Sequence, residues 1–175
     1  MGDRGLSLTE QRSQVSAWAL VAAPLLISAD LAGGLDNETL ALLAAPEVVA
    51  VSQDALAVQV RERGGGGRLS ASRPPIPPPP LQPHWQGTRV SPASPSGTEC
   101  WARPLSGGAV AAVLLNRGEG PADVSCTWAE LGLPAGAKAA VRDLWARADL
   151  GDFTGAFTAR GVESHGAVMV RVTML

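Results

Sequence analysis

The run of glycines and prolines from Arg63 to Trp85 (RGGGGRLSASRPPIPPPPLQPHW) most limits how this 175-residue chain can fold. Four consecutive glycines offer no side chains to pack, and proline lacks the backbone N–H that a helix interior or a sheet ladder requires. We therefore expect no packed helix or strand in this run. The segments on either side of it have to be interpreted separately.

Three ordinary interpretations of the run can be compared. A phosphate-binding loop is excluded, because no Lys-Ser or Lys-Thr pair follows the glycines and no strand precedes them. A plain linker is one alternative. A polyproline helix that docks an SH3-like partner is another, because RPPIPPPP contains the PxxP pattern.

We favour a fourth interpretation, a translated retained intron over residues 60–86. Removing this block joins QDALAVQ to GTRVSPASPSG in one reading frame. Val60-Arg61-Glu62 can be encoded by codons that open with a splice-donor sequence, and Gln86 by a codon that ends with a splice acceptor. If the insertion is present in the protein, we expect it to be disordered, because few apolar groups offset its ordering entropy.

Residues 1–59 carry the signals of helix, buried strand and helix. Ser7 and Glu10 form a capping box for a helix that we expect to run to about Ala23. Asp36 is predicted to cap a second helix. A proline at position 46 is predicted to begin a further helical turn.

Leu25, Leu26 and Ile27 form a continuous apolar run with a polar end, which predicts a short buried parallel strand. A lone parallel strand needs neighbours on both sides, and residues 1–24 supply none. We therefore interpret residues 1–59 as the end of a larger α/β domain.

Residues 87–175 have a different pattern, which predicts a small antiparallel β-domain. Gly, Pro, Asp and Asn separate its short strand-like segments. These are ECWARPLS, GAVAAVLLNRG, ADVSCTW, KAAVRDLW, DFTGAFTA and GAVMVRVTML.

Composition narrows the function classes. The net charge of -2 argues against a nucleic-acid surface, which needs a basic patch. The longest apolar run, 17–27, is too short to span a membrane. No signal peptide is visible, because residues 1–6 are polar and lead directly into a helix.

Two cysteines, Cys100 and Cys126, are too few for a disulfide scaffold. Both lie in predicted strands, so a single bridge forms if those strands are neighbours. Two buried free thiols are the favoured alternative. Two Cys and two His have no zinc-ligand spacing, so we expect no metal site.

Five segments, in this order, are similar to the C-terminal part of the α-galactosidases (melibiases) of glycoside hydrolase family 27. They are GLSLTEQRSQVSAWALVAAPLLISADL, ETLALLAAPEVVAVSQDALAVQ, GTRVS…ECWARPLSGGAVAAVLLNRG, VRDLW and SHGAVMVRV. Each segment is a weak signal by itself, whereas their order and compatible spacing make the resemblance specific. It covers nearly the whole chain except residues 60–86.

The resemblance implies a fold class of α/β plus all-β. Residues 1–59 would be the last βα units of an incomplete (β/α)8 TIM barrel, and residues 87–175 a small antiparallel β-sandwich. It also implies hydrolysis of terminal α-D-galactosides with retention, through a nucleophilic aspartate and an acid/base aspartate. In the family both aspartates lie upstream of the residues that match this chain. No catalytic residue is therefore assigned, and the chain alone is predicted to be inactive.

Asp30 is the one predicted substrate-binding residue, because it follows the expected strand at the end where barrel enzymes place their sites. An orienting or structural role is favoured over catalysis. Asp54 and Asp143 are predicted to be loop or cap residues. His165 is predicted to make a structural hydrogen bond, and its adjacency to Ser164 does not make a catalytic triad.

An alternative function is a non-catalytic β-sandwich module that binds carbohydrate or docks a partner through the proline-rich segment. Trp101, Trp128 and Trp145 are candidate sugar platforms, although their apolar strand contexts favour core positions. The resemblance implies a galactoside partner and leaves open a homodimer. We expect no cofactor, nucleic acid or membrane partner, and the compartment is left open, since the family is secreted, vacuolar or lysosomal.

Trp18 is predicted to pack in the core of the missing barrel. Without that barrel, Trp18 and the predicted strand at residues 25–27 lose their packing partners. We therefore expect residues 87–175 to be the only part that folds well.

Overall fold

The computed structural model describes residues 5–27, 34–56, 87–92 and 94–175. Three helices come first, and eight strands with one 3-10 turn follow. They are α1 (Leu8–Leu20), α2 (Asn37–Leu43), α3 (Pro46–Ser52), β1 (Thr88–Arg89), β2 (Thr98–Pro104), η1 (Ser106–Gly108), β3 (Val110–Asn116), β4 (Ala122–Thr127), β5 (Lys138–Asp143), β6 (Ala148–Thr154), β7 (Ala156–Val162) and β8 (Ala167–Met174). Within the described ranges no helix is both long and apolar enough to cross a membrane.

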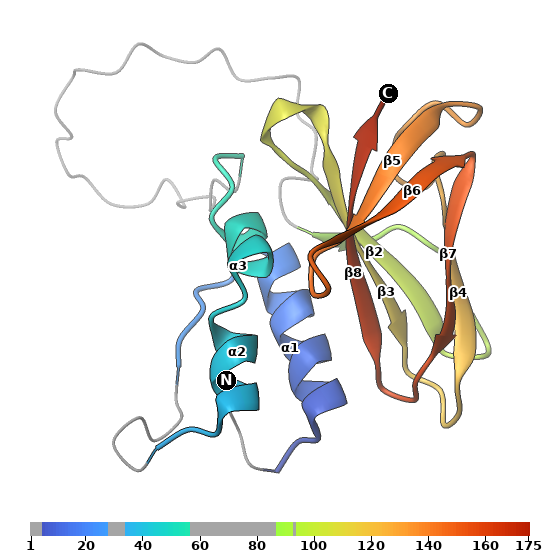
Figure 1. Cartoon of the computed structure of the whole chain (residues 1–175). Helices are drawn as coiled ribbons and strands as arrows, with labels where there is room; N and C mark the ends of the chain where they lie inside the picture. The colour runs from blue at the N-terminus through green and yellow to red at the C-terminus, as the bar shows by residue number, and fades with distance from the viewer. Residues whose placement is uncertain (1–4, 28–33, 57–86, 93) are drawn as a thin grey trace, which may run out of the picture.

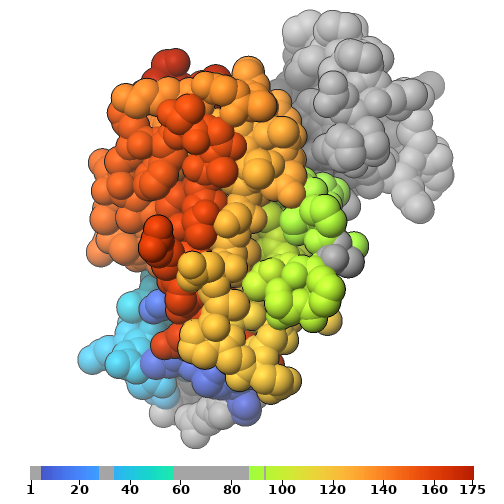
Figure 2. All heavy atoms as spheres, turned by 90° about the vertical axis from the view of Figure 1, so that its right-hand side faces the viewer, coloured from blue at the N-terminus to red at the C-terminus, as the bar shows by residue number. Residues whose placement is uncertain are grey.

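The strands form two antiparallel sheets that enclose a core, which confirms the predicted β-sandwich (Figure 1). The larger sheet has the order β1-β2-β3-β8-β5-β6, and the smaller pairs β4 with β7. Figure 2 shows the sandwich from the side away from the helices, whose blue and cyan atoms appear only at its lower edge. The helices therefore pack on the outer face of the larger sheet, the face away from the smaller sheet.

The sequence of strand β3 reflects burial of the larger sheet on both of its faces. Val110, Ala112 and Leu114 belong to the core between the sheets. Ala111 and Val113, which alternate with them, belong to a second core that faces the helices. Successive side chains point to opposite faces of a sheet, so a strand covered on both faces has to be apolar throughout. The sequence VAAVLL meets this requirement.

Helices α1 and α3 close the second core against the outer face of the larger sheet (Figure 1). Val15, Ala19 and Val48 are each at most 2% exposed. The prediction that only residues 87–175 fold well overlooked this shared core, which now argues against it. Trp18 is 38% exposed in this chain, and its predicted place in the core of a complete barrel stays a prediction.

The predicted helix starts are confirmed, because they rest on contacts within one turn, whereas α1 ends at Leu20 and not at about Ala23 as predicted. The Ser7 hydroxyl accepts from the Glu10 amide, and the Glu10 side chain accepts from the Ser7 amide. Asp36 accepts from the Thr39 amide at the start of α2. Pro46 is the first residue of α3.

The predicted parallel strand at residues 25–27 is wrong. These residues form no strand, and the side chains of Leu26 and Ile27 are 71% and 49% exposed. Every strand pair in the described part of the chain is antiparallel and lies beyond residue 87. An extended segment without a sheet edge to join has no ladder of hydrogen bonds to hold it.

The segment DFTGAFTA, predicted as one strand, contains the end of β6 and the beginning of β7. Gly155 separates them with a φ of 79°, a left-handed conformation that glycine adopts without strain. Strand β6 begins earlier, at Ala148, and six of its seven residues are exposed. An exposed edge strand lacks the apolar alternation by which a strand is recognised in sequence.

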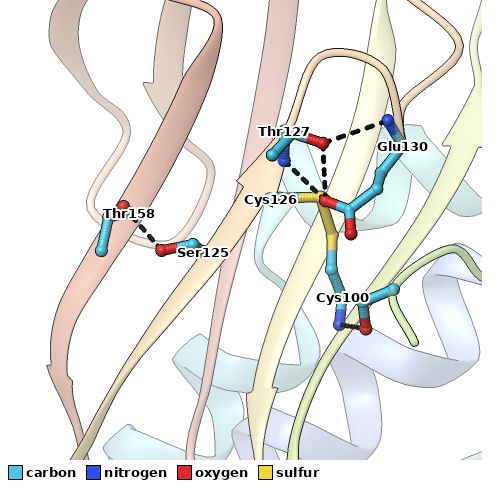
Figure 3. The surroundings of a disulfide bond; sticks show 7 residues. Cys100, Ser125, Cys126, Thr127, Glu130 and Thr158 are labelled. Carbon is cyan, nitrogen blue, oxygen red and sulfur yellow. Dashed lines mark hydrogen bonds between the residues drawn. A yellow bond between two sulfur atoms is a disulfide. The ribbon is translucent and has the colours of Figure 1, made fainter. Parts of the chain in front are cut away.

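The favoured prediction of two free thiols is also wrong. Cys100 on β2 and Cys126 on β4 form a disulfide (Figure 3). The two strands are not neighbours in a sheet, because they belong to opposite sheets and face each other across the core. The sequence prediction considered pairing only within a sheet and therefore missed this arrangement.

Gly87, where the described chain resumes, lies tightly against helix α1. A Cβ atom at this position would lie 2.7 Å from Cγ of Leu20 and 2.8 Å from the Leu20 carbonyl oxygen. Only glycine allows so close an approach. The chain thus enters the sandwich in contact with the helix that covers it.

Candidate functional site

Asp30, the predicted substrate-binding residue, lies outside the described residues, which end at residue 27 and resume at residue 34. The predicted insertion at residues 60–86 also lies outside them. Among the described residues, polar side chains gather at the junction between the helices and the sandwich.

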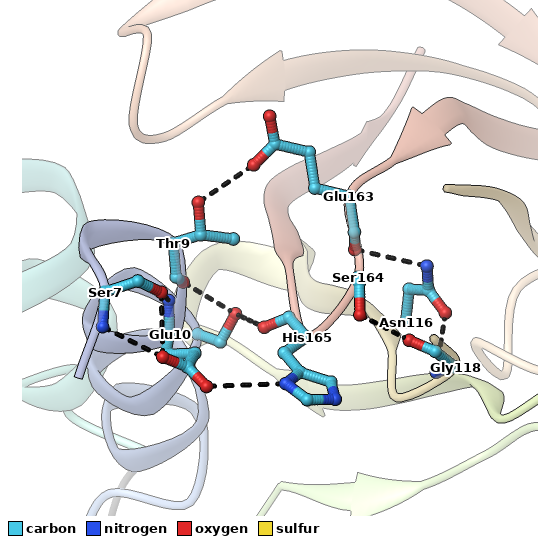
Figure 4. Close-up of polar contacts among 9 residues, drawn as sticks. Ser7, Thr9, Glu10, Asn116, Gly118, Glu163, Ser164 and His165 are labelled. Atoms are coloured by element: carbon cyan, nitrogen blue, oxygen red, sulfur yellow. Dashed lines mark hydrogen bonds and ion pairs between the residues drawn. The ribbon is translucent and has the colours of Figure 1, made fainter. Parts of the chain in front are cut away.

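The turn between β7 and β8 docks on the first turns of α1 (Figure 4). The Thr9 hydroxyl donates to the Glu163 carboxylate at 2.8 Å, and the Ser13 hydroxyl donates to the His165 carbonyl at 2.7 Å. Nδ1 of His165 lies 3.4 Å from the Glu10 carboxylate. The predicted structural role of His165 is therefore confirmed.

Ser164 and His165 point to different partners, so they form no nucleophile–base pair. The Ser164 hydroxyl donates to the Gly118 carbonyl at 2.7 Å, on the sandwich side of the turn (Figure 4). The His165 ring faces α1. A serine hydrolase would require the hydroxyl to donate to the imidazole.

Asn116 anchors the same turn from within the sandwich. Its side chain is fully buried, and its Nδ2 group donates to the carbonyls of Gly120, Val162 and Glu163. Its Oδ1 accepts from the Gly118 amide. A buried amide needs such partners, because an unsatisfied polar group inside a protein is costly.

A second connection joins α3 to β5. Arg142 donates to both carboxylate oxygens of Glu47, each at 2.8 Å, in a bidentate pair. It also donates to Asp149 and to the Arg147 carbonyl. Glu47 and Arg142 lie 95 residues apart in sequence, so no local spacing could have predicted their ion pair.

A third connection joins the end of α3 to β2 and the turn that follows it, through Asp54 and the Val51 carbonyl. Asp54 accepts from the amide and the hydroxyl of Ser106, at 2.9 and 2.6 Å. The buried Arg103 on β2 donates to the Val51 carbonyl. Asp54 is thus a loop residue, as predicted.

Asp143, the other carboxylate predicted to be a loop or cap residue, accepts hydrogen bonds from the amides of residues 145 and 146 and caps the turn after β5.

Four carboxyls in the helical part have lowered pKa values. Backbone hydrogen bonds from Ser7 and from Thr39 lower the pKa of Glu10 and of Asp36. The hydrogen bonds from Arg142 lower that of Glu47. Burial alone would raise the pKa of Asp54, but hydrogen bonds from residues 56 and 106 outweigh it. A glycosidase acid needs a raised pKa, so none of the four is suited to that role.

We expect acid to release the helices from the sandwich, because Glu47 and Asp54 bridge the two. A carboxyl with a lowered folded-state pKa contributes stability above its unfolded pKa and loses it as pH falls through the folded value. Hydrogen exchange of the α3 amides should therefore accelerate below about pH 4, before that of β3.

Glu47→Gln tests this expectation. It should lower the free energy of opening of α3 by about 1 kcal/mol at pH 7, because the pair is partly exposed, and by almost nothing at pH 3. Glu119→Gln is the matched control, since Glu119 has no polar partner in the described part of the chain. An equal effect of Glu47→Gln at both pH values would contradict the ionic origin.

The three candidate sugar platforms lie in different environments. Trp128 is fully buried between the sheets, and its indole N–H donates to the Ala137 carbonyl. Trp101 and Trp145 are partly buried against the second core, and their indoles donate to Glu99 and Ser16. Trp128 cannot stack on a sugar without unfolding the sandwich.

The described residues contain no cluster of three or more His, Cys, Asp or Glu side chains that could hold a metal ion. The polar groups at the junction thus connect the helices to the sandwich through caps, turns and ion pairs. This arrangement holds two structural layers together.

Family models match both layers. Residues 1–54 match a model described as "Alpha galactosidase A", and residues 95–172 match the "Alpha galactosidase C-terminal beta sandwich domain". The chain belongs to glycoside hydrolase family 27. It corresponds to the C-terminal portion of the family's α-galactosidases: a helical end of the catalytic domain followed by the β-sandwich.

Curated relatives agree with this family. An α-galactosidase of Coffea arabica is 35% identical over 173 residues, which are 99% of this chain and 38% of that protein. A probable α-galactosidase of Dictyostelium discoideum is 33% identical over 177 residues, with the same coverage of 99% and 38%. The chain thus spans less than two fifths of the length of these relatives.

Solved structures share the fold. α-Galactosidase I from Mortierella vinacea superposes with a TM-score of 0.75 at 21% identity, over 97% of this chain and 36% of that one. A β-L-arabinopyranosidase from Geobacillus stearothermophilus gives 0.73 at 21% identity, over 96% and 31%. This portion of the fold therefore occurs in enzymes named for different sugars.

Proposed function

We propose that this chain forms the C-terminal part of a retaining α-galactosidase that hydrolyses terminal α-D-galactosides. Residues 1–59 would end its catalytic barrel, and residues 87–175 would brace that end. The supporting observation is the apolar core that α1 and α3 share with β3 and β8. A sandwich that served as an independent binding module would not need helices of a catalytic domain as part of its core.

The two catalytic aspartates are proposed to lie in the part of the enzyme that precedes these residues in its relatives. The 175-residue chain by itself would then have no glycosidase activity. The lowered pKa values of Glu10, Asp36, Glu47 and Asp54 support this, because a retaining mechanism needs one carboxyl that stays protonated. Asp30 is proposed to orient the substrate.

Galactose is proposed as the sugar on the strength of the curated relatives, since the shared fold also serves an arabinopyranosidase. Within such an enzyme, the sandwich would hold the last helices of the barrel in place. A misplacement of about 1 Å at a catalytic group can reduce a rate a hundredfold, which gives this bracing a catalytic consequence.

Activity on an aryl α-galactoside tests the proposal. The chain alone should give no turnover. A chimera in which it replaces the corresponding portion of the Coffea arabica enzyme should give turnover. Activity of the chain alone would overturn the proposed position of the catalytic pair. A folded but inactive chimera would overturn the proposed role of this portion.

A further inference from the structure

We propose that a cleft between the helices and the β5–β6 turn binds the carboxylate of an acidic sugar. The cleft has a volume of about 510 Å³. It is lined by α1, α2, the link to α3 and the β5–β6 turn. Its polar lining consists mainly of Arg12, Arg147, Glu38 and Trp145.

Arg12 is oriented by an aromatic ring. Its guanidinium lies over the Trp145 indole, 5.4 Å from the ring centroid. The ring is itself fixed, because its N–H donates to the Ser16 hydroxyl at 2.9 Å. Stacking occupies the face of a guanidinium and leaves the N–H groups at its edge available to an acceptor.

Arg147 enters the cleft from the turn. Its backbone adopts a φ of 54°, and its carbonyl accepts from Arg142 at 2.8 Å, which holds the turn in this shape. In the described ranges, neither Arg12 nor Arg147 forms a side-chain hydrogen bond or ion pair with a carboxylate. The nearby carboxylates of Glu47 and Asp149 are both bound by Arg142.

The charges in the cleft select the chemistry of the ligand. Two guanidinium groups favour a carboxylate, which matches the geometry of their N–H pairs. Glu38 adds one negative charge and accepts hydrogen bonds, so it would oppose a multiply charged inorganic anion and favour hydroxyl donors. A uronate has both a single carboxylate and several hydroxyls. Leu42 and Leu144 add the apolar wall that sites for small molecules require.

The choice of a sugar as the scaffold of this ligand rests on the proposed function, whereas the binding of a carboxylate does not. Binding is measured on this chain without any catalytic step. A failure of the cleft proposal is thus distinguishable from a failure of the proposed galactosidase activity.

Calorimetric titration with D-galacturonate is the test, with D-galactose and acetate as controls. We expect saturable binding of galacturonate that weakens as salt is added, and at least tenfold weaker binding of both controls. Arg12→Gln and Arg147→Gln should each weaken galacturonate binding about tenfold or more. Arg160→Gln, on β7 and outside the cleft, should leave it unchanged.

Other results would overturn the proposal. Equal binding of galactose and galacturonate would remove the role of the carboxylate. Equal binding of acetate would remove the role of the sugar. Absence of galacturonate binding to the folded chain, verified by its circular dichroism, would remove the site. Full affinity in the Arg12→Gln and Arg147→Gln variants would place binding elsewhere.

Discussion

Trp128→Ala is expected to lower the free energy of unfolding of the sandwich by about 3–5 kcal/mol. The Trp128 side chain is fully buried in the core between the two sheets. Removing it creates a cavity that the surrounding strands can fill only partly, and leaves the Ala137 carbonyl without its indole donor. Urea denaturation followed by circular dichroism measures the loss.

Trp128→Phe separates the two causes. It keeps most of the apolar volume but leaves the Ala137 carbonyl unpaired, so we expect it to cost about 1–3 kcal/mol. A loss below 1 kcal/mol for Trp128→Ala would mean that the indole is not part of the core. If Trp128→Ala instead left the sandwich fully stable but abolished its binding of a sugar, Trp128 would be a sugar-stacking side chain after all.

Local signals in this sequence could be interpreted correctly because their partners lie within one helical turn. The capping box at Ser7 and Glu10 and the cap at Asp36 depend on contacts three residues apart. The antiparallel sandwich could be predicted for a similar reason. Most of its strands, though not the exposed edge strand β6, are short, apolar on at least one face and separated by turn residues.

The strand predicted at residues 25–27 failed because a strand is defined by its neighbours. The pattern of apolar residues there is that of a buried strand, yet nothing in the described part of the chain pairs with it. The apolar pattern shows that a segment is able to form a buried strand, but the strand forms only where a neighbouring strand pairs with it.

The junction between the helices and the sandwich could not be predicted at all. Thr9 and Glu163 lie 154 residues apart, and Glu47 and Arg142 lie 95 apart. No spacing rule connects such pairs, because they meet only after both layers have folded. The cleft with Arg12 and Arg147 was missed for the same reason, whereas the assignment of Asp30 stays a prediction.

The disulfide is expected to contribute about 3 kcal/mol to the stability of the sandwich. Cys100 and Cys126 are at most 1% exposed and lie 26 residues apart, so the bridge closes a loop of that length in the unfolded chain. Closing the loop removes entropy from the unfolded state. The double variant Cys100→Ala/Cys126→Ala should therefore melt on the order of 10 °C lower than the oxidised protein.

Loss of the disulfide should also change the urea dependence of unfolding, which is a second measurable effect. Without the bridge the unfolded chain is more expanded, so the dependence of unfolding on urea should become steeper as well as shifted. Ser125→Ala is the matched control, because its side chain points out of the sandwich to Thr158 (Figure 3). It should lower the stability by less than about 0.5 kcal/mol.

The test needs protein folded under oxidising conditions, where buried bridges form and persist. Mass spectrometry of alkylated protein then shows whether both thiols are blocked. Two alkylated cysteines in the folded protein would contradict the bridge itself. A blocked pair whose removal left both the melting temperature and the urea dependence unchanged would instead show that the sheets are held together without it. The core of β2, β3 and β4 around Leu114 and Trp128 would then be sufficient to join the two sheets.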